Sequence, residues 1–189
     1  MTITDQEFKN KDFTNSVLAK GEYDNCVFIN CNFSEMDLSH FEFLECEFEN
    51  CNWSNAKVNN TALKDITFSN CKILGVDFSI CNPFLLQLAF NACQLNFSSF
   101  YQLKLKETSF LNSELVEVDF TETNLTKSDF TGSKLSGAQF ENTILTHADF
   151  SNAENFSINP SLNKLTKTKF SNTSLQGLLH HLDIVIINN

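Results

Sequence analysis

Hydrophobic residues recur at every fifth position along most of this chain. A first series runs from Phe8 to Phe78, and all fifteen of its positions are apolar. The series slips by two residues in segment 79–84, resumes at Leu85 and continues to Phe150 with leucine and phenylalanine in alternation. A period of five fits neither the 3.6-residue period of an amphipathic helix nor the two-residue period of a strand. Each five-residue unit is therefore predicted to form one side of a turning coil, with its central side chain directed to the axis.

The residue two places before each apolar centre is mostly small, as expected where a second side chain must also point inward. All seven cysteines occupy this position: Cys26, Cys31, Cys46, Cys51, Cys71, Cys81 and Cys93. The sequence contains no CxxC pair, so no ligand spacing supports a zinc site. We therefore interpret the cysteines as small buried groups rather than catalytic or metal-binding residues.

The pattern changes near the C-terminus. Four leucines follow the helical spacing i, i+3, i+4, i+7: Leu175, Leu178, Leu179 and Leu182. Segment 171–174 offers serine N-caps for this helix, and segment 183–187 is predicted to be a strand. We expect a repeat domain over residues 1–170, with a frame slip at 79–84, followed by a helix and strand over 171–189 that cap the solenoid.

Charge narrows the choice of partner. The formal net charge is −10, and all 13 basic residues are lysine, so direct binding to nucleic acid or an anionic membrane is disfavoured. The carboxylates avoid the inward positions and form two clusters that serve either as a solvated face or as a surface competing for a DNA-binding groove. These residues are Glu22, Asp24, Glu35, Asp37, Glu42, Glu45, Glu47 and Glu49, then Glu114, Glu117, Asp119 and Glu122.

No catalytic motif is recognisable in the sequence. His180 and His181 are adjacent and point in different directions on a helix, while His40 and His147 lie outside the inward positions. We expect no enzymatic activity, no cofactor and no metal. The N-terminus has no basic and apolar leader and no apolar run is long enough to span a membrane, so a cytoplasmic location is expected.

The frame slip admits two interpretations. A tolerated bulge is the simpler one, because insertions in repeat proteins commonly map to loops. The alternative is a binding loop formed by Asn82, Pro83 and Phe84.

The five-residue pattern resembles the pentapeptide-repeat family, whose consensus is A-(D/N)-(L/F)-x-x. The best local matches are the units 128–132, 138–142 and 148–152, and the resemblance extends over about residues 6 to 154. It implies an all-β, right-handed quadrilateral β-helix with four pentapeptides per coil, so that residues 20 apart stack. On that basis Phe90, Phe110, Phe130 and Phe150 form one column, and Cys31, Cys51 and Cys71 form another.

Within the family, the chain resembles the topoisomerase-protecting branch, which includes Qnr-type quinolone-resistance proteins and the McbG-type microcin immunity protein. The matching segments are 124–133, Ile158-Asn159-Pro160, and Gly177-Leu178 leading to an apolar end. The resemblance implies a DNA mimic that binds DNA gyrase or topoisomerase IV and either protects it from an inhibitor or regulates it by competing with DNA.

It also implies a homodimer formed through the C-terminus. The expected contact residues are Leu175, Leu178, Leu179, Leu182, Ile184 and Ile186. A structural or adaptor rod that binds some other protein is the alternative from a different class.

Overall fold

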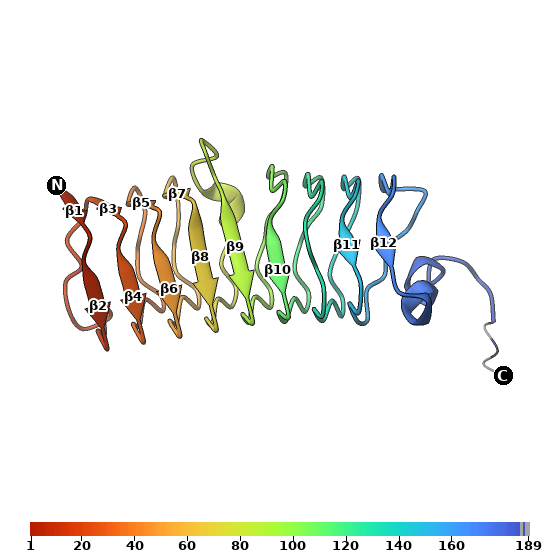
Figure 1. Cartoon of the computed structure of the whole chain (residues 1–189), viewed down its shortest axis with the longest axis horizontal. Coiled ribbons are helices and arrows are strands. Elements are labelled where there is room, and N and C mark those ends of the chain that lie inside the picture. The colour runs from red at the N-terminus through yellow and green to blue at the C-terminus, as the bar shows by residue number, and fades with distance from the viewer. Residues whose placement is uncertain (186, 188–189) are drawn as a thin grey trace.

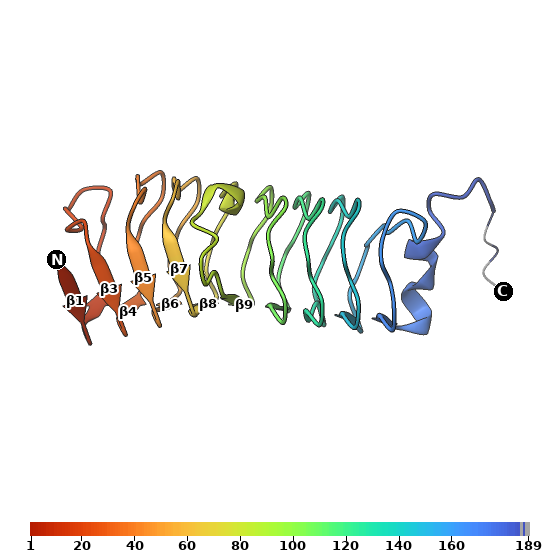
Figure 2. The same ribbon diagram turned by 90° about the horizontal axis from the view of Figure 1, so that it is seen from above.

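The computed structural model is a straight rod made of stacked coils, with the N-terminus at one end and the C-terminus at the other (Figures 1 and 2). It describes residues 1–185 and residue 187. Parallel pairing joins residues 20 places apart, as Thr2 pairs with Glu22 and Glu22 with Glu42, and residues 22 places apart across the frame slip. The expected 20-residue coil and the β-helix are confirmed.

Short parallel strands line two neighbouring sides of the rod. One sheet has the order β1-β3-β5-β7, a second has the order β10-β9-β8-β6-β4-β2, and β11 pairs with β12. The strands are β1 (Thr2–Thr4), β2 (Glu7–Lys9), β3 (Glu22–Asp24), β4 (Val27–Ile29), β5 (Glu42–Leu44), β6 (Glu47–Glu49), β7 (Ala62–Lys64), β8 (Ile66–Ser69), β9 (Leu88–Asn91), β10 (Ser109–Leu111), β11 (Asp149–Phe150) and β12 (Lys169–Phe170). Two 3-10 helices, η1 (Phe78–Ile80) and η2 (Asn172–Leu178), complete the chain. Among the described residues, no helix has the length and hydropathy needed to cross a lipid bilayer.

The four sides are numbered in chain order by their central, inward residues. Side 1 has Ile3, Tyr23, Phe43, Leu63, Leu105, Leu125, Leu145 and Leu165. Side 2 has Phe8, Phe28, Phe48, Phe68, Phe90, Phe110, Phe130, Phe150 and Phe170. Side 3 has Phe13, Phe33, Trp53, Ile73, Leu95, Leu115 and Leu135, and side 4 has Leu18, Leu38, Val58, Phe78, Phe100, Phe120 and Phe140.

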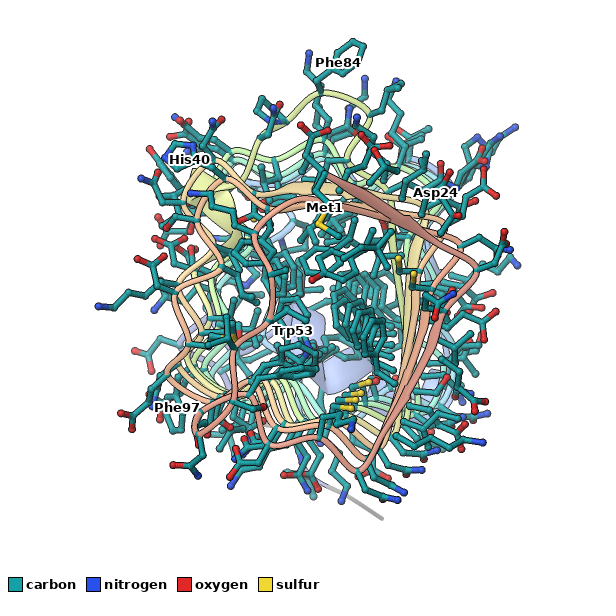
Figure 3. The ribbon with its side chains drawn as sticks, turned by 90° about the vertical axis from the view of Figure 1, so that its left-hand side faces the viewer. Met1, Asp24, His40, Trp53, Phe84 and Phe97 are labelled. Carbon is teal, nitrogen blue, oxygen red and sulfur yellow. The ribbon has the colours of Figure 1, made fainter. Side chains whose placement is uncertain are left out.

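The core is an aromatic ladder along side 2. Its nine phenylalanine rings stack from coil to coil, with neighbouring centroids between 4.6 and 5.4 Å apart. A shorter ladder on side 4 begins at Phe78 and meets the first edge to face, as Phe100 does with Phe110 at 5.5 Å and 78°. Figure 3 looks down the rod and shows these rings filling its interior. The predicted phenylalanine column is confirmed.

The small inward residues fix one coil to the next through hydrogen bonds. The Ser128 hydroxyl donates to the carbonyl of Leu105 at 2.8 Å, and the Cys51 thiol lies 3.3 Å from the carbonyl of Phe28. All seven cysteines are buried and none is in a disulfide. Their predicted burial is confirmed, and the contacts show why serine, threonine and cysteine exchange at this position: each offers a short donor to the coil before it.

The corners of the rod explain the abundance of asparagine. The residue two places after each centre commonly has a positive φ, as at Asn70 with φ 54°. Asparagine tolerates this left-handed conformation better than most residues. At several corners, side chains also pair between coils, as the Asn25 amide does by donating to Asp5 at 2.7 Å.

The inserted residues at the frame slip change which leucine points inward. Pairing aligns Ala62 with Asn82 and Ile66 with Leu88, so five residues occupy the space that three fill in the coil before. Leu85, expected to resume the inward series, instead has φ 57° and is 65% exposed. Leu86 packs against the core in its place. The expectation for Leu85 is wrong because the extra residues move the left-handed corner onto it.

The C-terminal segment differs in detail from the expected helix and strand. The helix occupies residues 172–178, but it is a 3-10 helix, and its N-cap Ser171 makes no side-chain capping hydrogen bond. Residues 183–185 belong to no strand, so the strand predicted over 183–187 is not formed there. Ile186 lies outside the described residues.

Candidate interaction surfaces

The N-terminal acidic cluster gathers around the corner between sides 1 and 2. β3 and β5 place Glu22 beside Glu42 on side 1, and β6 carries Glu47 and Glu49 on side 2. Glu45 lies between them at the corner with φ 51°. Like charges in register repel each other, so this corner favours a positively charged partner. Asp24 belongs to the same group.

The C-terminal acidic cluster lies around the corner between sides 3 and 4. Glu114 is on side 3, 3.6 Å from the Lys134 ammonium, and Glu117 occupies the corner with φ 54°. On side 4, Asp119 accepts a hydrogen bond from the Thr121 backbone at 2.8 Å. Glu122 lies one corner further on, between sides 4 and 1, with φ 56°, so it is outside the corner that the other three share; it accepts a hydrogen bond from the Gln102 amide at 2.7 Å.

These two clusters are diagonally opposite and do not form one surface. In Figure 3, Asp24 lies at one corner of the cross-section and Phe97, at the corner between sides 3 and 4, lies at the opposite one. Glu35 and Asp37 belong to this second corner, although they precede Glu42 closely in the sequence. The structure therefore divides the first sequence cluster between two corners, because the chain turns every five residues.

The frame slip forms a loop over residues 83–87 that projects from side 1. The Asn82 side-chain oxygen accepts a hydrogen bond from the backbone of Phe84 at 3.0 Å and so sets the turn. Phe84 is 67% exposed, and Figure 3 shows its ring standing clear of the rod. A crevice beside it is lined by Pro83, Phe84, Leu86, Gln102, Leu103 and Lys104.

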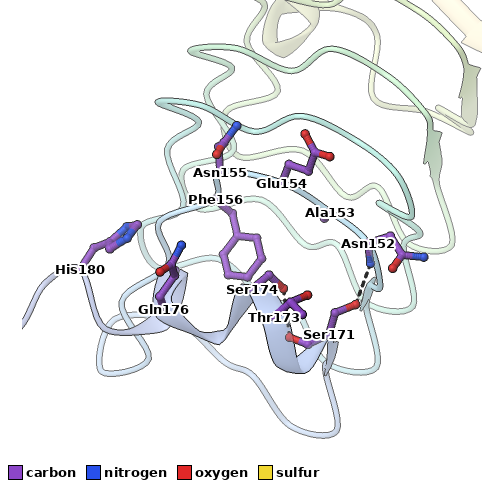
Figure 4. Close-up of a pocket in the computed structure, with 11 residues that line it drawn as sticks. Asn152, Ala153, Glu154, Asn155, Phe156, Ser171, Thr173, Ser174, Gln176 and His180 are labelled. Atoms are coloured by element: carbon purple, nitrogen blue, oxygen red, sulfur yellow. Dashed lines mark hydrogen bonds between the residues drawn. The ribbon is translucent and has the colours of Figure 1, made fainter. Parts of the chain in front are cut away.

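The C-terminal helix closes the end of the rod through Gly177. Its carbonyl accepts a hydrogen bond from the Ile158 backbone at 2.9 Å, and a Cβ atom there would lie 2.5 Å from the Phe156 carbonyl oxygen. Figure 4 shows Phe156 facing η2 across a hollow whose polar groups include His180 and Glu154.

The rest of this end remains apolar on its surface. Leu178 packs partly against the core, whereas Leu175, Leu179, Leu182 and Ile184 are between 37% and 53% exposed.

Burial makes the thiols of Cys46 and Cys81 poor nucleophiles and poor metal ligands. It raises the pKa of Cys46 to about 12 and that of Cys81 to about 12. Thiolate is the reactive form, and burial in apolar surroundings disfavours it. In the part of the chain that the structure describes, no three histidine, cysteine or acidic side chains form a metal-binding group.

Two groups of surface residues are not evident from the linear sequence. Lysines gather on the C-terminal half of side 1, and the aromatic residues Phe97 and Tyr101 are exposed near the middle of the rod. Both groups emerge when residues are sorted by their position in a 20-residue coil, because linear clustering hides neighbours that lie a whole coil apart.

The chain was compared with protein-family models, curated protein sequences and solved structures. A family model described as a pentapeptide repeat region matches residues 1–78, 41–120 and 81–150. No curated protein sequence matches the chain. Its fold is similar to that of a trypsin-treated form of QnrB1, described as a plasmid-mediated fluoroquinolone resistance protein, with a TM-score of 0.65, 20% identity, and 99% of this chain and 100% of that chain covered.

A second similar structure is HetL from the cyanobacterium Nostoc, described as a pentapeptide repeat protein involved in heterocyst differentiation regulation. Its TM-score is 0.55, its identity is 17%, and the match covers 88% of this chain and 84% of that chain. At these identities the likeness concerns the fold.

Proposed function

This chain belongs to the pentapeptide-repeat family, and we propose that it is a non-enzymatic, cytoplasmic DNA mimic that binds DNA gyrase or topoisomerase IV. Binding protects the enzyme from an inhibitor such as a quinolone or a microcin, or regulates it by competition with DNA. The proposal is supported most by the combination of rod and charge. A rigid rod presents carboxylates along two diagonal edges, as a duplex presents phosphates along two strands.

The length and net charge of the rod can be compared with those of a DNA duplex. Nine stacked coils spaced like neighbouring strands give a rod about 38 Å long. A duplex of that length carries roughly 22 phosphate charges. The net charge of −10 is about half of that, so shape must contribute as much to recognition as charge.

Supercoiling by purified gyrase, with and without a quinolone, tests this function. The protein is expected to change supercoiling or to restore it when the inhibitor is present. Reversal of Glu42, Glu45, Glu47 and Glu49 to lysine is expected to abolish the effect, because these exposed carboxylates form the N-terminal acidic corner.

A matched control separates position from total charge. Lysine at Glu7, Glu141, Glu154 and Asp183 gives the same change in net charge at exposed positions that belong to neither acidic cluster. This control is expected to keep the activity. Absence of any effect of the parent protein on gyrase or topoisomerase IV would overturn the proposal.

The projecting loop is a second proposed contact. Asn82 and Pro83 hold Phe84 away from the rod, where an aromatic side chain can enter an apolar pocket on a partner. Phe84→Ser is expected to weaken protection while leaving the fold intact, because the ring is exposed. Unchanged protection by this variant would restrict the contact surface to the acidic corners.

We also propose that two copies join end to end through the C-terminal segment. Four exposed apolar side chains there support the proposal: Leu175, Leu179, Leu182 and Ile184. Leu178 supports the docked helix from beneath, and Ile186 remains part of the predicted interface. The triple change of Leu175, Leu179 and Leu182 to glutamine is expected to shift sedimentation from dimer to monomer. A parent protein that is monomeric at micromolar concentration would contradict this interface.

An adaptor role remains the second candidate function. The exposed Ile80, Phe84, Phe97 and Tyr101 favour it, because apolar side chains in the middle of a charged rod suit a protein partner other than a DNA-binding groove. A purified complex with a non-topoisomerase partner that is lost on changing Phe97 and Tyr101 to serine, but kept when the acidic corners are reversed, would favour this role.

A further inference from the structure

Side 1 changes the sign of its charge halfway along the rod. Before the loop at 83–87 it carries six carboxylates and one lysine, a net charge of −5, and after the loop it carries five lysines and one glutamate, a net charge of +4. The first group is Asp5, Glu22, Asp24, Glu42, Glu45, Asp65 and Lys64. The second group is Lys104, Lys106, Lys127, Lys164, Lys167 and Glu107.

The other three sides show no such reversal. Side 2 is net −2 before the middle of the rod and −1 after it, side 3 is neutral and then −2, and side 4 is neutral and then −3. The reversal on side 1 is therefore not a consequence of the overall acidity, which would make every half negative or neutral.

The loop lies at the centre of this pattern. On side 1 it forms the fifth of nine successive rungs, with carboxylates on all four rungs before it and lysines on three of the four rungs after it. It presents Phe84 and Leu85, which are 67% and 65% exposed. In Figure 3, Phe84 projects from the side of the rod that also carries Met1.

We propose that side 1 is the contact surface for a second copy of this chain, lying alongside the first in the opposite direction. In such a twofold contact, the first half of side 1 on one copy faces the second half of side 1 on the other. The two halves must therefore carry opposite charges if the copies are to attract each other. With the axis at the loop, Asp5 faces Lys164 and Lys167 of the second copy, and Asp65 faces Lys104 and Lys106. The two loops meet at the axis and bury Phe84 and Leu85 there, giving an apolar centre within a charged surround, so this contact and the proposed contact of Phe84 with a topoisomerase exclude each other.

Ion pairs within one copy do not prevent the same side chains from interacting with a second copy. Glu42 lies 3.6 Å from the Lys64 ammonium, and Glu107 lies 2.7 Å from that of Lys127. All four groups stay partly or largely exposed, so water screens these pairs and a facing charge can still interact with them. A facing lysine would also relieve the repulsion between Glu22 and Glu42, which are in register.

The surface is narrow, which sets the expected strength. A side about 38 Å long and about 10 Å wide buries about 760 Å² over the two copies, below the roughly 1,200 Å² of stable interfaces, so the contact should be weak and governed by charge. It is distinct from the end-to-end contact proposed for the C-terminal segment. The two together would assemble more than two copies, so the test removes the end contact first.

The variant with Leu175, Leu179 and Leu182 changed to glutamine lacks the end-to-end contact and serves as the background protein. Its association is measured by sedimentation. On this background we expect a dimer whose dissociation constant rises at least about tenfold between about 0.05 M and 0.5 M salt, because screening weakens exposed pairs. Two charge variants are then compared. In the first variant, Lys104, Lys106 and Lys127 are changed to glutamate, so both halves of side 1 are acidic. In the second variant, Glu42, Glu45 and Asp65 are changed to lysine, so both halves are basic.

Each charge variant alone is expected to be monomeric, because its side 1 repels its own copy in both halves. An equal mixture of the two is expected to dimerise again, since every changed residue then faces the opposite charge. A control with glutamate at Lys11, Lys57 and Lys72, on other sides, should dimerise as the background does. A monomeric background protein at low salt, self-association of either variant as strong as the background, or a mixture that remains monomeric would each overturn the proposal. No topoisomerase is present, so the result is independent of the gyrase proposal.

Discussion

Phe130 and Phe150 stack with ring centroids 4.6 Å apart and planes 12° from parallel, although twenty residues separate them in the chain. Both rings are fully buried. Phe130 also meets Phe120 edge to face at 5.6 Å and 88°. One ring thus contributes to a ladder along the rod and to a contact across it, so it couples neighbouring coils as well as neighbouring sides.

Removing this ring should destabilise the whole solenoid. Phe130→Ala is expected to lower the free energy of unfolding by about 3–5 kcal/mol, from lost burial and the cavity left behind. Phe130→Leu should cost less, because leucine fills the equivalent position on sides 1 and 3. Chemical denaturation measures both, with Phe84→Ala as the exposed control. Equal losses for Phe130→Ala and Phe84→Ala would show that the ladder does not carry the stability.

Phe97 is an unfavourable residue for its backbone position. It has φ 64° and is 59% exposed, so a bulky side chain adopts a left-handed conformation without the benefit of burial. Phe97→Asn is expected to raise stability by about 0.5–1 kcal/mol, because asparagine tolerates this conformation. Asn70→Val at an equivalent corner, with φ 54°, should lower it. Thermal unfolding would detect both shifts, and a stabilising Asn70→Val would contradict the argument.

Gly177 should control the docking of the C-terminal helix. An added Cβ would lie 2.5 Å from the Phe156 carbonyl oxygen and close to its ring, so Gly177→Ala must push η2 away from the rod. We expect faster hydrogen exchange and proteolysis over residues 172–178, with little change in the coils before residue 150. Gln176→Ala, at an exposed neighbouring position, is the control. If residues 172–178 of Gly177→Ala remain as protected from hydrogen exchange and proteolysis as those of the parent protein, the helix docks elsewhere.

Burial should protect the cysteines from alkylation. With pKa values of about 12 at Cys46 and Cys81, almost no thiolate is present at neutral pH. A thiol-reactive dye is expected to label the folded protein far more slowly than the unfolded protein, in which all seven thiols should react. Rapid labelling of Cys46 in the folded state, measured by peptide mass, would contradict the packing described for it.

The same raised pKa values predict how stability varies with pH. The folded state holds the thiol proton more tightly than the unfolded state, whose cysteines ionise near pH 9. Stability from this source is therefore complete below about pH 8 and is lost as pH rises from about 9 towards 12. Cys46→Ser should flatten the decline measured by denaturation at each pH, because a hydroxyl does not titrate there. An unchanged slope would exclude Cys46 as a contributor.

Much of the architecture is encoded locally. The period of five identifies the inward positions, and the placement of all seven cysteines at one repeat position predicts their burial without any knowledge of the fold. These inferences succeed because each pentapeptide repeats the same backbone path, so a residue's position in the unit determines the direction of its side chain. The spacing of the leucines also predicts the C-terminal helix, although the structure shows that it is a 3-10 helix.

Only the tertiary structure decided which residues share a surface. Glu35 and Glu45 are close in sequence but occupy diagonal corners, whereas Asp5 and Asp65 share side 1 across three coils. It also replaced Leu85 with Leu86 in the core, because alignment with the coil before determines where the chain turns when five residues occupy the space of three. In a solenoid, local sequence sets whether a side chain points in or out, while stacking between coils sets its neighbours.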